Sequence, residues 1–277
     1  PWEKRICSFF IERSKLNKVW VRKMAIAASH VLERRMVMSG FSPADFGRAF
    51  EKIQMEYQTG IGAYLAPFFH LMAVLVLCYH LLNKKKNPKL FNIWFAVNYL
   101  WIFSYVGIYM FYRFYQELGV WSVAFWGVLP LLLGNIFFNW VQSARKSTGE
   151  IMDWDFSNIP RWRWLITPFI AFGFWYPTYI YGQGFVFTAK DLLFSFFGLM
   201  PCPTTIVTLG ILTLKYPAVH KGLYNALTLF AVWIGSFQIL LGYVPDYPLA
   251  MVGYYSLGLI ISDRCARVRR NRTGVQE

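Results

Sequence analysis

Long uncharged apolar runs constrain the fold of this chain more than any other feature. Seven such runs contain no Asp, Glu, Lys or Arg in their interior, and a bilayer-spanning helix needs about 20 residues. Because hydrocarbon offers no hydrogen bonds to the backbone, each run is expected to be helical. We predict an all-α polytopic integral membrane protein whose seven transmembrane helices lie near residues 60–82, 91–112, 121–141, 164–181, 202–214, 223–241 and 247–261.

The composition agrees with a membrane protein and excludes several soluble classes. The 277 residues include 28 Lys and Arg against 14 Asp and Glu, yet 56% of the chain is hydrophobic and only 15% is charged. Because the basic residues lie between the apolar runs, the net charge of +14 does not indicate nucleic-acid binding. The high aromatic content excludes disorder, and four cysteines are too few for a disulfide scaffold.

The positions of the basic residues predict the orientation. Three alternate segments between the apolar runs and the segment after the last run together hold fifteen Lys and Arg, whereas the opposite segments between runs hold only Arg113 and Lys190. Cytoplasmic loops collect basic residues, so the pattern predicts an outer N-terminus and a cytoplasmic C-terminus. The arginine-rich segment 263–277 follows the last run directly, and we expect it to be a cytoplasmic tail that binds anionic inner-leaflet lipid.

The first 37 residues do not fit this orientation. Residues 1–35 carry nine Lys or Arg and three Glu on the side predicted to be outside. One interpretation is a basic amphipathic helix on the membrane surface. The other, which we favour because the charge rule fails only there, is a non-native extension before a start at Met36 or Met38.

Residues 38–59 are predicted to form an interfacial amphipathic helix before the seven-helix domain at 60–262. Ser42 is a suitable N-cap, Pro43 suits the first helical position, and Asp45 lies in the first turn. Apolar residues then recur at helical spacing, at Phe46, Ala49, Phe50, Ile53 and Tyr57.

The sequence Pro201-Cys202-Pro203-Thr204-Thr205 is the strongest local motif. Two prolines cannot lie inside a regular helix, so we expect Cys202 in extended backbone at a helix N-terminus. Thr204 and Thr205 are expected to cap the exposed amides there. Three interpretations of the motif remain open: a kinked helix start that permits close packing, a solute-binding site, and a reactive or metal-binding thiol.

The chain resembles a bacterial family of multi-span membrane proteins known as domain of unknown function six-zero-six-four. The resemblance is carried by the stretch Phe197 to Gly210, which includes Thr208, and extends loosely over residues 38–262. It implies a helical membrane fold in the bacterial inner membrane and supplies no activity, cofactor or catalytic residue.

Other chemistry is weakly indicated. His70 lies about halfway along the first run, and we expect it to be neutral and hydrogen-bonded because no span offers an acidic partner. Cysteine and histidine spacing predicts no metal site, and no nucleotide or hydrolase motif is present. Carboxylates at Glu150, Asp153 and Asp155 are more typical of a self-paired loop than of catalysis.

The leading functional hypothesis is therefore a small transporter, permease or channel-like protein rather than an enzyme, and no cofactor is expected. Its solute site is expected at Pro201, Cys202, Pro203, Thr204, Thr205 and Thr208, with His70 as a further candidate. The alternative is a non-catalytic membrane anchor, sensor or assembly partner, suggested by the apparent absence of any buried charge.

Overall fold

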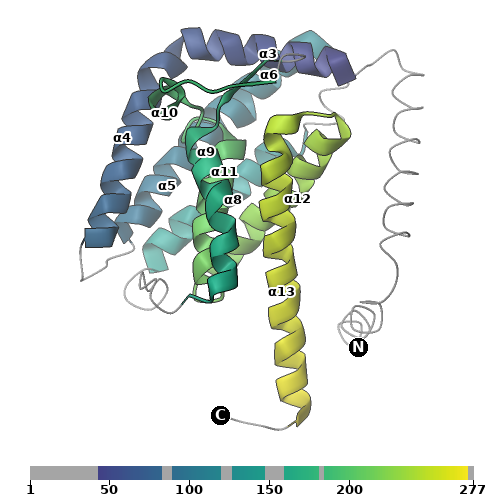
Figure 1. Ribbon diagram of the computed structural model, residues 1–277. Coiled ribbons are helices and arrows are strands. Elements are labelled where there is room, and N and C mark those ends of the chain that lie inside the picture. Colours follow the sequence, from purple (N-terminus) through teal and green to yellow (C-terminus); the bar gives the residue numbers. More distant parts are fainter. Residues whose placement is uncertain (1–42, 83–88, 120–126, 147–158, 181–183, 274–277) are drawn as a thin grey trace. The chain divides into compact units, whose positions relative to one another are not determined.

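A computed structural model describes residues 43–82, 89–119, 127–146, 159–180 and 184–273 (Figure 1). The described chain is mostly helical, with one short antiparallel hairpin. Residues Phe46–Leu257 form one compact unit, and the part of α13 from Gly258 onward belongs to a second unit. The predicted N-terminal extension and the carboxylates of the 150–155 loop lie outside the described residues.

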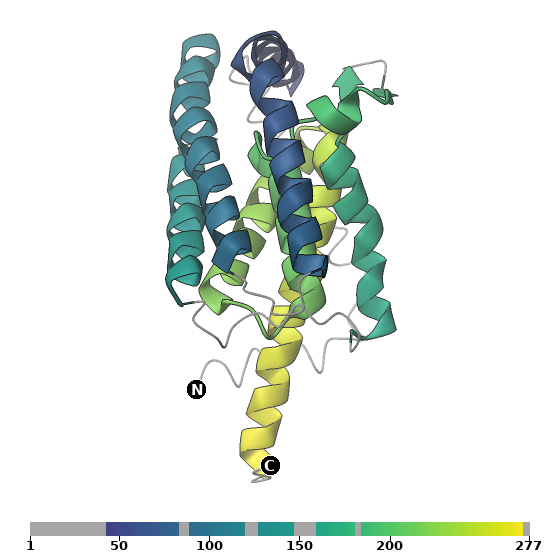
Figure 2. The same ribbon diagram turned by 90° about the vertical axis from the view of Figure 1, so that its left-hand side faces the viewer.

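Most of the predicted elements form helices. The first is α3 (Pro43–Thr59), which begins at the predicted proline. Within the larger unit, α4 and α5 run alongside each other in both views (Figures 1 and 2). The helical segments after α3 are α4 (Ile61–Leu82), α5 (Lys89–Ile102), η2 (Phe103–Met110), α6 (Phe111–Leu118), α8 (Leu129–Lys146), η3 (Arg161–Ile166), α9 (Thr167–Trp175), α10 (Asp191–Phe194), α11 (Pro201–Lys215), α12 (Lys221–Leu240), η4 (Val244–Asp246) and α13 (Tyr247–Thr273).

Among the described residues, three helical segments are long and apolar enough to cross a membrane: Ile61–His80, Lys89–Leu118 and Lys221–Leu240. The second is α5, η2 and α6 in continuous succession. On α4 the side chains of Leu71, Val74 and Leu75 are exposed. Such an apolar outward face suits lipid better than water.

The prediction of one helix over residues 164–181 is wrong in its second half. A 3-10 turn and α9 occupy the first part, and α9 ends at Trp175. Tyr176 adopts a left-handed conformation at φ 35° and ψ 78°, and the following Pro177 cannot donate to a continuing helix. The chain instead forms a hairpin in which β1 (Thr178–Ile180) pairs with β2 (Gly184–Val186).

Two other predicted boundaries differ. The run predicted to start at Trp121 is helical only from Leu129 among the described residues. The boundary predicted between 262 and 263 falls inside α13, which continues as one helix to Thr273. Hydropathy falls where the arginines begin, but arginine is a good helix former and does not end the helix.

Close helix contacts depend on residues without bulky side chains. At Gly173 of α9 an added Cβ would lie 2.8 Å from the Ile206 side chain of α11. At Gly235 of α12 it would lie 2.6 Å from the backbone nitrogen of Ala250 in α13. These positions let helix backbones approach closely, as small residues commonly do in membrane bundles.

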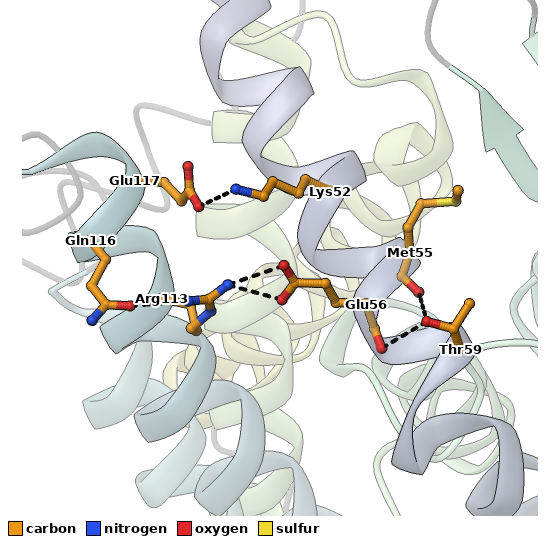
Figure 3. Close-up of polar contacts among 7 residues, drawn as sticks. All are labelled: Lys52, Met55, Glu56, Thr59, Arg113, Gln116 and Glu117. Atoms are coloured by element: carbon orange, nitrogen blue, oxygen red, sulfur yellow. Dashed lines mark hydrogen bonds and ion pairs between the residues drawn. The ribbon is translucent and has the colours of Figure 1, made fainter.

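Helix α3 is joined to α6 by ion pairs, as Figure 3 shows. The Lys52 ammonium lies 2.6 Å from a Glu117 carboxylate oxygen. One guanidinium nitrogen of Arg113 donates to both carboxylate oxygens of Glu56, at 3.1 and 3.0 Å. The predicted interfacial helix is therefore fastened to the end of the second long helical segment.

Candidate functional site

The start of α11 places the Pro-Cys-Pro motif inside the protein. Met200 is the extended residue before the helix, with φ −113° and ψ 148°, and Pro201 begins the helix. Cys202 is therefore helical, so the prediction of extended backbone at this cysteine is wrong by two positions. Both prolines lie in the first turn, where a missing amide donor breaks no helical hydrogen bond. The prediction that Cys202 lies at a helix N-terminus is confirmed.

The threonines of the motif are buried and paired. Thr204 Oγ1 accepts a hydrogen bond from the Gly198 amide at 2.8 Å and donates to the Met200 carbonyl at 2.7 Å. It thus fixes the chain that enters α11 and does not cap the first amides of the helix. Its hydroxyl is not directed to a ligand.

The next two threonines join α11 to α5. The Tyr99 hydroxyl lies 2.8 Å from Thr205 Oγ1 and 3.3 Å from Thr208 Oγ1. Thr208 also donates to the Thr204 carbonyl at 2.8 Å. Because all three hydroxyls are buried and already paired, Thr205 and Thr208 contribute to the interface between α11 and α5.

His70 belongs to a different cluster. Its Nδ1 lies 3.0 Å from the Ala66 carbonyl, and its Nε2 lies 3.0 Å from Ser195 Oγ, which donates to the Phe174 carbonyl. The ring is buried between Phe174 and Phe197. The expected hydrogen-bonded state is confirmed, and among the described residues no hydrogen bond joins His70 to Cys202.

A buried carboxyl, Asp246, is the feature that sequence reasoning missed. It lies in η4, between α12 and α13, and is 0% exposed. Tyr176 donates its hydroxyl to Asp246 Oδ1 at 2.7 Å, and the Cys202 thiol is a second hydrogen-bonding partner of the carboxyl. Oδ2 has no hydrogen-bond partner among the described residues. Burial raises the pKa of Asp246 to about 6, although the two hydrogen bonds act in the opposite direction.

A cavity of about 30 Å³ lies beside the start of α11. Cys202 and Tyr176, the two partners of Asp246, both line it. Gln238 of α12 lines it as well, is 0% exposed, and has neither side-chain amide atom paired within the described chain. The remaining wall is mostly aromatic and aliphatic. The cavity therefore offers a ligand one amide donor and one amide acceptor in apolar surroundings, which is the usual character of a small-molecule site.

Helix α3 and α6 close one side of this cavity. Phe50 of α3 and Phe114 of α6 both line it, with ring centroids 6.0 Å apart. Phe50 also meets the ring of Tyr243 edge-on at 5.0 Å, three residues before Asp246. The ion pairs of Figure 3 join the same two helices, so they hold the aromatic cover in place.

Basic groups gather at the other end of α11. Arg163 donates to the carbonyls of Leu214 and Tyr216, where the helix ends at Lys215. Nearby, His220 caps α12 by accepting the Leu223 amide at 3.2 Å. Burial, and then the charge of Lys146, lower the pKa of His220. The cavity and this basic cluster thus lie at opposite ends of one buried helix.

One sequence signal could have identified Asp246. It is the single carboxylate between residues 192 and 262, in a five-residue turn between two apolar runs. A short turn between two packed helices has little room to turn an acidic side chain towards water. The assumption that the protein buries no charge-bearing group is therefore wrong.

Comparisons with known proteins add no assignment: no family model, curated protein or solved structure matches the chain. Within the described residues, no three His, Cys, Asp or Glu side chains come together as a metal site requires. The structure itself shows a mostly helical protein with three helical segments suited to crossing a membrane, and with a buried polar site at the start of α11.

Proposed function

We propose that the protein is a multi-span inner-membrane transporter for a small hydrogen-bonding solute, with its binding site in the cavity of Cys202 and Gln238. The observation that carries this proposal is the unpaired amide of Gln238, fully buried at the wall of a cavity. An unpaired buried amide costs about 1–3 kcal/mol. A ligand or water that pairs both amide atoms removes that cost.

The proposed topology has seven spans, as the charge pattern predicts, and the bacterial family resemblance fits it. In this arrangement the basic cluster at Arg163 and Lys215 faces the cytoplasm. The cavity at the opposite end of α11 then faces the outer side. Helix α3, with Phe50 against the cavity, serves as the outer cover of the site.

The size of the cavity limits the solute in this closed state. A volume of about 30 Å³ is enough to hold a water molecule, which needs at least about 10–15 Å³ of such space. The suitable class is a neutral or singly charged molecule of a few heavy atoms that both donates and accepts hydrogen bonds. Formamide and urea are practical probes of that class.

Flux into proteoliposomes tests the proposal. Gln238→Leu removes the amide and keeps a similar volume, and should reduce the flux of the transported probe at least tenfold. Gln116→Leu is the matched control, because Gln116 is an exposed amide that accepts from Arg113. Flux that is the same in wild type, Gln238→Leu and protein-free vesicles for every probe would refute transport through this site.

Thiol labelling tests the proposed cover separately. Cys202 is buried, Cys265 in the arginine-rich part of α13 is partly exposed, and Cys78 is exposed on the membrane-spanning α4. A maleimide should therefore label Cys265 rapidly, and Cys202 and the lipid-facing Cys78 slowly. Phe50→Ala should speed the labelling of Cys202 and leave that of Cys78 unchanged. Equal labelling of Cys202 with and without Phe50 would show that α3 does not cover the cavity.

The alternative function, a non-catalytic anchor, sensor or assembly partner, rested on the absence of a buried charge-bearing group. The burial of Asp246 removes that support.

A further inference from the structure

The burial of Asp246 calls for an explanation beyond solute binding. A carboxyl taken out of water is stable as a carboxylate only when cations or several donors surround it. Here the groups that face it are the Tyr176 hydroxyl at the end of α9 and the Cys202 thiol of α11. Both are neutral, and the neighbouring α12 presents the neutral amide of Gln238 to the same cavity.

The described residues place no cationic side chain, whether Lys, Arg or His, in an ion pair with this carboxyl. The ring of Tyr243 also lies nearby, against Phe50, and its hydroxyl influences that of Tyr176. Among the described residues, Asp246 Oδ1 therefore has a hydrogen-bond donor, whereas Oδ2 has none.

We propose that Asp246 is a reversible proton-binding site, and that its proton exchanges with water through the cavity lined by Cys202 and Tyr176. The proton adds to the unpartnered Oδ2 and neutralises the carboxyl, while Oδ1 keeps the hydrogen bond from Tyr176. On release, the proton leaves to water in the cavity and the carboxylate remains. No bond other than the O–H bond forms or breaks.

The geometry supplies a route for that proton. Tyr176 and Cys202 each contact both the carboxyl and the cavity, so a water in the cavity is separated from Asp246 by one side chain. Phe50 contacts Tyr243 and lines the same cavity. Movement of α3 would thus admit water to the carboxyl and to Gln238 together. The inference does not require that a solute is transported, since proton binding is measurable without one.

Infrared spectroscopy of the purified full chain tests the inference. A protonated carboxyl has a carbonyl band that a carboxylate lacks, and this band should disappear as the pH rises through the range from about 5 to about 7. Asp246→Asn should lose the band. Asp263→Asn is the control, because Asp263 is paired with Arg267 and its loss should leave the band unchanged. A pH-dependent band that persists in Asp246→Asn would overturn the assignment.

Two further measurements keep the test decisive. Tyr176→Phe removes a donor that favours the carboxylate, so the midpoint of the band's titration should move to higher pH, by about one unit or tenfold in proton affinity. This variant decides the question if Asp246→Asn does not fold. In heavy water the band should shift as the proton exchanges. A band that stays unshifted over hours would refute exchange through the cavity, and an unmoved midpoint in Tyr176→Phe would refute the site.

Discussion

The pH dependence of stability provides the most searching test of the buried carboxyl. The proposed perturbation is Asp246→Asn, which keeps the size of the side chain and its acceptor for Tyr176 but removes the ionisable group. In the folded protein the pKa of Asp246 is raised from 3.8 to about 6 because burial disfavours the charged form. The folded state consequently holds its proton at pH values where the unfolded chain has lost it.

The sign and size of the effect follow from this difference. Because the folded carboxyl binds its proton more tightly than the unfolded one, stability falls as pH rises from 3.8 to about 6, and the cost is complete above that range. A pKa raised from 3.8 to about 6 corresponds to about 3 kcal/mol. The asparagine variant lacks this cost, so its free energy of unfolding relative to wild type should rise by up to about 3 kcal/mol between acid and neutral pH.

Equilibrium unfolding of the detergent-solubilised protein, followed by tryptophan fluorescence at several pH values, measures this difference. His220 contributes with the opposite sign, because its lowered pKa makes stability fall as the pH falls below 6.5. Its contribution is present in both proteins and cancels in the comparison. A difference between wild type and variant that does not change with pH would refute the reasoning, whatever its absolute value.

Three other predictions concern packing and the cover of the cavity. Gly235→Ala should destabilise the protein by about 1–3 kcal/mol in the same unfolding assay, because the new Cβ would lie 2.6 Å from a backbone nitrogen of α13. The control Gly258→Ala should be neutral or slightly stabilising, because its Cβ would meet no atom within 4 Å. Tyr99→Phe should cost about 1–3 kcal/mol by leaving two buried threonine hydroxyls of α11 with fewer partners; an unchanged free energy of unfolding would contradict the interface. Glu56→Arg should speed maleimide labelling of Cys202, because it places an arginine of α3 next to Arg113 of α6. The double variant Glu56→Arg with Arg113→Glu restores opposite charges and should restore slow labelling.

Several elements were predictable because local chemistry specifies them. The start of α3 follows from Pro43, whose fixed φ suits a first helical turn. The apolar runs that became α4 and α12 are long enough that backbone hydrogen bonding inside a helix is the stable solution. The motif prolines likewise had to lie at a helix end, and α11 begins at Pro201.

Other elements were not predictable from hydropathy, because hydropathy reports where apolar residues lie and not how the backbone runs. The stretch after Trp175 contains many apolar residues and was therefore predicted to be helical. The left-handed Tyr176 and the following proline end α9 there, and the chain forms a hairpin. In the opposite direction, α13 continues past the last apolar residue to Thr273. The arginines make this part of the helix polar, but its backbone remains helical.

By itself, the sequence determined a mostly helical protein with membrane-spanning segments and a helix N-terminus at the Pro-Cys-Pro motif, because apolar runs and prolines act on their own neighbourhood. Only the tertiary structure decided which polar groups became a site. It paired the motif threonines with Tyr99 and brought Tyr176 and Cys202 to Asp246. The Tyr176–Asp246 contact joins residues 70 apart in the chain. Burial of a carboxyl depends on such distant partners, and no local pattern specifies them.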